Sequence, residues 1–157
     1  AALSDSERPV YASLSWVAYV GETVPERFHK TFKVVTGARD ATVAFIQDRV
    51  KRRRLVKGFE ADQKARSEIG KSGLASRFLH RTGHSLDTSL EGDGANLDDY
   101  ETHDTRGLVL GSGFTVGPGI YVPGDYGLRS VVDLHVVRAG VEVTTPMQSR
   151  ITPILLK

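Results

Sequence analysis

The order in which apolar patterns follow one another limits the folds open to this chain. Residues 10–20 are rich in β-branched and aromatic types, which predicts a strand. Helical spacings then run over residues 25–54 and again over 59–69. Short β-like stretches follow at 114–122, 128–137, 141–145 and 151–155. This order indicates an α+β fold, with helices packed on one face of a curved, mainly antiparallel sheet.

Length, composition and charge narrow the class of protein. The 157 residues are 39% hydrophobic and 25% charged, as expected for one globular domain over residues 1–157. No apolar stretch approaches the ~18 residues of a membrane span, and the first residues lack a signal-peptide pattern, so we expect no membrane partner. The sequence has no cysteine, which excludes disulfides and thiolate metal ligands and makes the cytoplasm the default location.

A basic cluster, KRRR at residues 51–54, falls at the predicted end of the long helix. Cations at that place favour the helix dipole, and a solvated helix end is their more frequent meaning. The formal net charge is only +2. We therefore expect no nucleic-acid partner.

Several segments carry a family resemblance. Residues 77–87 (RFLHRTGHSLD) resemble the HRTGHxIG segment of Xaa-Pro peptidases, and residues 114–121 (FTVGPGIY) resemble their FTIEPGIY segment. Residues 126–133 (YGLRSVVD), 141–144 (VEVT) and 10–16 (VYASLSW) resemble FGVRIEDD, AEVLT and VYADITW. The chain thus resembles the C-terminal part of the pita-bread domain of Xaa-Pro dipeptidases, methionine aminopeptidases and creatinase. The resemblance implies a truncated pita-bread fold without the family's N-terminal half.

The same resemblance implies that the metal site is degenerate. The family holds two divalent metals with an Asp, Asp, His, Glu, Glu set, because paired hard cations need several anionic oxygens. His84 matches the ligand histidine. Ser13 stands at the second Asp position and Gly117 and Val131 at the two Glu positions, while the first Asp would fall near Ala2. One imidazole cannot hold such a centre, so we expect no metal, no cofactor and no metal-dependent peptide hydrolysis.

Five residues are the candidate site. His84 is either a relict held by packing or a reused acid–base group, and His103 is either a solvated loop histidine or its partner in catalysis. Tyr121 and Arg129 match motif residues that border the family's cleft, and Arg129 suits a carboxylate. Glu101 lies two residues before His103. We expect a ligand to be bound by His84, Glu101, His103, Tyr121 and Arg129.

Trp16 is the only tryptophan. It follows the Ser13 position by three residues, and it either lies near the same cavity or packs in the core.

Three functions remain open from the sequence. The first is a metal-free, peptidase-like domain that binds a small molecule, a peptide or a protein in the relict cleft. The second is a repurposed acid–base enzyme, such as a lyase, isomerase or cyclase, that uses His84 and His103. The third is an Xaa-Pro-type metallopeptidase completed by a partner subunit. Because half of the family's sheet is missing, we also expect a homodimer or a partner chain that covers the open edge.

Overall fold

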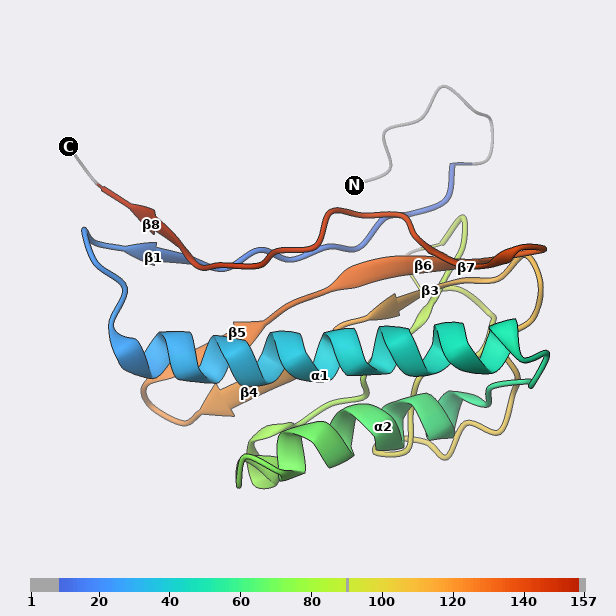
Figure 1. Ribbon diagram of the computed structural model, residues 1–157, viewed down its shortest axis with the longest axis horizontal. Helices are drawn as coiled ribbons and strands as arrows, with labels where there is room; N and C mark the ends of the chain where they lie inside the picture. Colours follow the sequence, from blue (N-terminus) through green and yellow to red (C-terminus); the bar gives the residue numbers. More distant parts are fainter. Residues whose placement is uncertain (1–8, 90, 156–157) are drawn as a thin grey trace.

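The computed structural model describes residues 9–89 and 91–155 (Figure 1). Two helices follow the N-terminal extended segment, and short strands occupy the second half of the chain. The elements are β1 Ala18–Val20, α1 Glu26–Lys51, α2 Gly58–Gly70, a 3-10 turn at Ala75–Arg77, β2 Ser85–Leu86, β3 Gly113–Val116, β4 Gly119–Val122, β5 Tyr126–Arg129, β6 Val132–Val137, β7 Gly140–Val143 and β8 Thr152–Ile154.

The strands form three small sheets. The main sheet has the order β2-β3-β6-β7 and is antiparallel throughout, β4 and β5 form an antiparallel pair, and β1 pairs with β8 in parallel. Helices α1 and α2 lie on one side of the main sheet, and the β1–β8 ribbon lies on the other (Figure 1). This arrangement confirms the expected α+β fold, with its helices on one face.

Two of the predicted strands are each divided in two. The stretch 114–122 is interrupted at Gly117 and Pro118, and the stretch 128–137 is interrupted at Ser130 and Val131. Pro118 has no N–H to offer to a ladder, so the strand bends there. The segment 10–20 is extended, but only Ala18–Val20 is a strand, with one further bridge from Ser15 to Val131.

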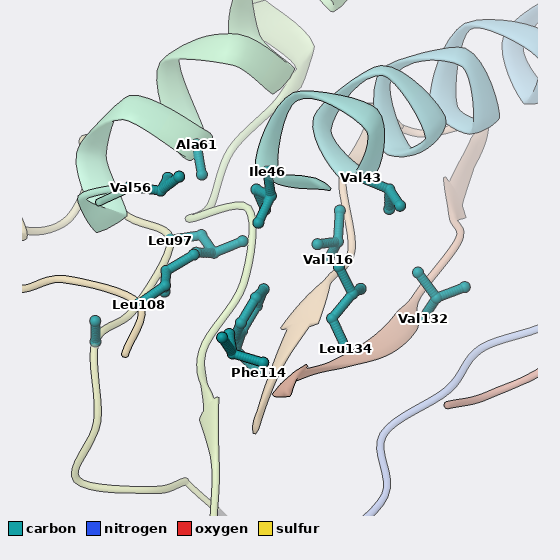
Figure 2. Close-up of a cluster of buried hydrophobic side chains, with 12 residues drawn as sticks. Val43, Ile46, Val56, Ala61, Leu97, Leu108, Phe114, Val116, Val132 and Leu134 are labelled. Carbon is teal, nitrogen blue, oxygen red and sulfur yellow. The ribbon is translucent and has the colours of Figure 1, made fainter. Parts of the chain in front are cut away.

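The core lies between the helices and the main sheet (Figure 2). Strand residues alternate between two faces, so Phe114 and Val116 of β3, with Val132 and Leu134 of β6, all point toward α1. They pack there against the helix residues Val43 and Ile46 and against Val56, Ala61, Leu97 and Leu108. The alternate positions of β3 and β6 therefore point away from the helices, on what we call the open face.

Hydrogen bonds tie the two ends of the described chain to this body. Arg39 of α1 is buried, and its guanidinium donates to Ser130 Oγ and to the carbonyl oxygen of Gln148. The Gln148 side chain in turn accepts from the N–H of Val17 and donates to its carbonyl oxygen. In the part of the chain that is described, no helix is long and apolar enough to cross a membrane.

Candidate active-site cleft

The best-matched motif places His84 in a row of three residues across the open face. His84 neighbours Thr115 of β3, whose N–H donates to the His84 carbonyl oxygen at 2.8 Å, and Thr115 pairs with Asp133 of β6. The Thr115 hydroxyl also accepts from the His84 N–H at 3.0 Å. His84 Nδ1 lies 2.9 Å from the Ser85 carbonyl oxygen, which can only accept. Nδ1 therefore carries a proton, and in the neutral ring Nε2 is left as an acceptor.

Asp133 is the acidic group of this row. Its side chain is 2% exposed, and Oδ2 accepts the N–H of Ser13 at 2.8 Å. Oδ1 is buried and has no hydrogen-bond partner among the described residues. Burial raises the pKa of Asp133 to about 6, although the Ser13 N–H and the nearby His84 oppose the shift. Sequence reasoning missed Asp133, and the only signal for it was its place at the end of the YGLRSVVD segment.

The next positions along the open face are Gly117 and Val131, which the sequence resemblance aligns with two of the family's ligand positions. A Cβ built on Gly117 would lie 2.7 Å from Val131 Cγ2 and 3.3 Å from a guanidinium nitrogen of Arg129. Val131 is buried. The valine side chain thus fills the space into which a side chain at residue 117 would extend.

A second polar cluster, of His80, Tyr121 and Arg129, lies further along the same face. His80 Nδ1 donates to the Arg81 carbonyl oxygen, so Nε2 accepts from the Tyr121 hydroxyl at 2.9 Å. Burial lowers the pKa of His80 and raises that of Tyr121. Arg129 Nε donates to the Gly117 carbonyl oxygen. The structure therefore brings Tyr121 and Arg129 together, with His80 as a third member, for which the sequence favoured a structural role.

The loop residues of the predicted site lie elsewhere. The exposed ring of His103 stacks on Phe59 of α2, and its Nδ1 is 2.6 Å from Asp99. Helix α2 lies on the side of the main sheet opposite the open face (Figure 1). His103 thus lies against α2, and its pairing with His84 as acid and base stays a prediction.

Glu101 lies beside Arg81. Its carboxylate accepts the N–H of Arg81 at 3.1 Å and forms an ion pair with the Arg81 guanidinium at 3.6 Å. It contributes to the electrostatics of His80, one residue before Arg81. Glu101 is thus a neighbour of the His80 cluster.

A cavity of about 580 Å³ opens beside the His84 row. It lies between the N-terminal segment, the β2 region and strand β6. Its polar lining includes Ser85, Asp87, Asp133, His135 and Thr144. Trp16 neither lines this cavity nor packs in the core, since its side chain is 58% exposed. Of the two alternatives that the sequence left open for Trp16, core packing is therefore wrong, and a place near the cleft stays a prediction.

The residues present do not fit the di-metal centre of the peptidases that the chain resembles. Gly117 and Val131 offer no donor atom, and Ser13 uses its backbone N–H on Asp133. Position 2 lies outside the described residues. Within residues 9–89 and 91–155, no group of three or more His, Cys, Asp or Glu side chains is placed to hold a metal ion. His84 and Asp133 alone are too few for two hard cations.

The fold and the motif order define a domain of the pita-bread peptidase class. The chain matches the model of metallopeptidase family M24 over residues 9–138 and belongs to this family. The X-Pro aminopeptidase of Thermotoga maritima matches 94% of the chain with a TM-score of 0.78 and 23% identity. The Xaa-Pro dipeptidase of Bacillus anthracis matches 91% with a TM-score of 0.72 and 29% identity.

These relatives are much longer than the matching region. An uncharacterized peptidase of Staphylococcus aureus is 35% identical over 86 residues, which is 55% of this chain and 23% of that protein. The chain covers 38% of the Thermotoga structure and 37% of the Bacillus structure. Membership of the family is therefore shown, while the activity of the longer proteins does not transfer with it.

Proposed function

We propose that this chain is a metal-free member of the family that binds a small molecule, a peptide or a protein segment in the relict active-site cleft. The packing of Val131 against Gly117 carries the proposal, because it fills the place of two metal-binding carboxylates with methyl groups. The cavity beside Asp133 remains large enough for a small ligand.

The two polar clusters suggest what the ligand contains. Asp133 Oδ1 lacks a donor, so a ligand N–H, O–H or ammonium group would satisfy it. Arg129 can bind a carboxylate with paired hydrogen bonds. Both groups point to the open face, at opposite sides of the Val131 position. A peptide or amino-acid derivative has both kinds of group.

Metal content tests the first half of the proposal. After incubation with Mn, Co, Fe or Zn and removal of excess ion, elemental analysis should find no stoichiometric metal, and Xaa-Pro dipeptides should stay uncleaved. Two bound metal ions per chain would contradict the proposal and favour a peptidase site completed by a partner subunit. The matched variant is Gly117→Glu with Val131→Glu, which returns two ligand carboxylates and should raise metal uptake if the backbone of the cleft is intact.

Ligand selectivity tests the second half. The probes are dipeptides with either a free or an amidated C-terminus, and the measurement is the shift in melting temperature on binding. The wild type should prefer the free carboxylate, Arg129→Ala should lose that preference, and His84→Ala should weaken binding of both probes. Arg52→Ala with Arg53→Ala at the end of α1 is the control and should match the wild type. Loss of binding in this control alone would assign the working surface to the basic cluster.

A second candidate is acid–base catalysis without metal. It is favoured by one observation, that His84 and Asp133 lie in the same row with only Thr115 between them. In such an enzyme the His84 Nε2 acceptor would take or return a proton. The His84→Ala variant should then lower turnover about 100-fold or more, as for a positioned acid or base. Binding with no turnover in the wild type leaves only the first candidate.

A further inference from the structure

Residues 80–84, which lead into β2, are positioned largely by side chains. The segment belongs to no regular strand, and Gly83 forms an isolated bridge to Leu97. The N–H groups of Arg81, Thr82 and His84 donate to side-chain oxygens. A single side-chain substitution can therefore move this segment without breaking a sheet.

Asp62 of α2 is the partner of Thr82. Its side chain is fully buried, and Oδ1 accepts both the Thr82 N–H at 2.8 Å and the Thr82 hydroxyl at 2.6 Å. Oδ2 accepts from Arg66 Nε at 2.5 Å and from the Asp99 N–H at 3.1 Å. Both oxygens thus have donors, as a buried carboxylate requires.

Arg66, one turn further along α2, binds the start of the same segment. Its guanidinium donates to the carbonyl oxygens of Phe78 at 3.2 Å and His80 at 2.7 Å. It also lies over the rings of Phe78 and Tyr100, at 4.4 Å and 4.5 Å from their centroids. Asp62 and Arg66 together therefore hold the backbone at residues 78, 80 and 82.

A chain of hydrogen bonds continues from Thr82 toward the cleft. The Thr82 carbonyl oxygen accepts the Gly117 N–H at 2.8 Å, and the Gly117 carbonyl oxygen accepts from Arg129 Nε at 3.1 Å. The chain starts at α2, on the helix side of the main sheet (Figure 1). Because Nε is engaged, a paired contact with a carboxylate would use the two terminal nitrogens of Arg129, and the Nε bond fixes where they point.

We propose that Asp62 is a positioning residue for the ligand site, and that it sets the direction of the Arg129 guanidinium through Thr82 and Gly117. The inference rests on the proposed function in one respect, that Arg129 binds the carboxylate of a ligand. Asp62 itself touches no ligand and acts through backbone groups. Its loss should therefore reduce selectivity for a carboxylate more than affinity for the rest of the ligand.

The ratio of the dissociation constants of the amidated and free dipeptides tests this role. An unfolded fraction weakens both probes equally, so the ratio does not report stability. The wild type should favour the free carboxylate by about 10-fold or more, as for a hydrogen bond to a charged group. Asp62→Asn exchanges an acceptor for an NH2 group that faces other donors, and it should remove most of this preference.

The matched control is Asp98→Asn. Asp98 is also buried, and its carboxylate accepts the N–H groups of residues 100–102 in its own loop. This variant loses a comparable buried acceptor outside the chain to Arg129. It should keep the wild-type ratio.

Substitutions at Thr82 test the same chain without altering the buried charge. Thr82→Val removes the hydroxyl donor and should lower the preference for the free carboxylate. Thr82→Ser retains a hydroxyl and should restore the preference. This pair also decides the question should Asp62→Asn fail to fold.

The Nε–H signal of Arg129 in NMR spectra gives a readout that needs no ligand, and Arg129→Lys assigns it by its loss. Its exchange with solvent should be slow in the wild type, since it is bonded to the Gly117 carbonyl oxygen. Exchange should be faster in Asp62→Asn and Thr82→Val, and unchanged in Asp98→Asn.

The two readouts separate this inference from the proposed function. A wild type that shows no preference between the probes would contradict the proposed function alone, and the exchange rates would then decide the role of Asp62. Unchanged preference with unchanged exchange in Asp62→Asn would overturn the inference. Equal changes in Asp98→Asn would overturn it as well, because they would show a general loosening of the loop.

Discussion

On one face of strands β3 and β6 the buried side chains all have suitable packing partners, whereas on the other face a buried oxygen atom lacks a hydrogen-bond donor in the described part of the chain. Toward the helices, Phe114 and Val132 are fully buried among apolar neighbours (Figure 2). Toward the open face, Asp133 is equally buried but leaves Oδ1 without a partner among the described residues. The helix side therefore stabilises the fold, whereas the open side retains a group that a ligand or a second chain would satisfy.

The open face keeps one carboxylate of the motif that the chain resembles. The motif FGVRIEDD has carboxylates at the positions of Val131, Val132 and Asp133, and this chain has only the last of them, at Asp133 of β6. Val131 instead fills the space that a Cβ at Gly117 would enter. A site built in this way suits binding of one polar group better than a pair of cations.

The largest loss of stability is expected when a buried side chain on the helix side of the sheet is truncated. Phe114→Ala removes a fully buried ring and should lower the free energy of unfolding by about 3–5 kcal/mol. Urea denaturation followed by circular dichroism measures this value. The control Leu110→Ala changes a side chain that is 60% exposed and should stay within about 0.5 kcal/mol of the wild type. Equal losses in both variants would mean that this core does not hold the fold together.

The buried carboxyl group of Asp133 on the open face should make the free energy of unfolding depend on pH. Because burial raises the pKa of Asp133 from 3.8 to about 6, the folded state holds this proton more firmly than the unfolded state. The contribution to stability is therefore complete below pH 4 and is lost as the pH rises through 6. The loss is of the order of 3 kcal/mol, since each pKa unit corresponds to about 1.4 kcal/mol.

The Asp133→Asn variant isolates this contribution. Subtracting its unfolding free energy from that of the wild type at each pH removes the other titrating groups. The difference should fall between pH 4 and 6 and then level off. A difference that rises with pH would mean that the ionised carboxylate is stabilised in the fold, and the unpaired Oδ1 would then be filled by a donor.

The sequence predicted a helix accurately where the apolar spacing and the residues at its ends indicated the same bounds. Helix α2 was expected at residues 59–69 and spans Gly58–Gly70, since its spacing and flanking glycines agree. Helix α1 was expected to reach residue 54 and ends at Lys51. Arg53, just after the helix, has a positive φ of 57°, which is incompatible with continuing the helix. The spacing of apolar residues does not predict this backbone conformation.

The site was harder to predict because motifs give positions along the chain and not neighbours in space. Tyr121 and Arg129 lie on two strands that pair in a hairpin, and their role in binding stays a prediction. His103 was assigned to the cleft from its acidic neighbours, but its stacking on Phe59 depends on the path of a long loop. Asp133 was missed because its burial and its unpaired oxygen arise only when Ser13, far away in sequence, packs on it.

The replacement of the metal ligands can be tested by a double-mutant cycle at Gly117 and Val131. In Gly117→Ala the new methyl group would meet Val131 Cγ2 at 2.7 Å, so the variant should lose about 1–3 kcal/mol through overpacking. Gly117 does not have a positive φ, and the loss therefore arises from the contact itself. Val131→Ala makes room for the methyl group, so the double variant should be more stable than the sum of the two single changes predicts, by about 1 kcal/mol or more. Urea denaturation of the four proteins gives the coupling. Strict additivity would show that the two positions do not touch, and that the place of the lost carboxylates remains open for another group.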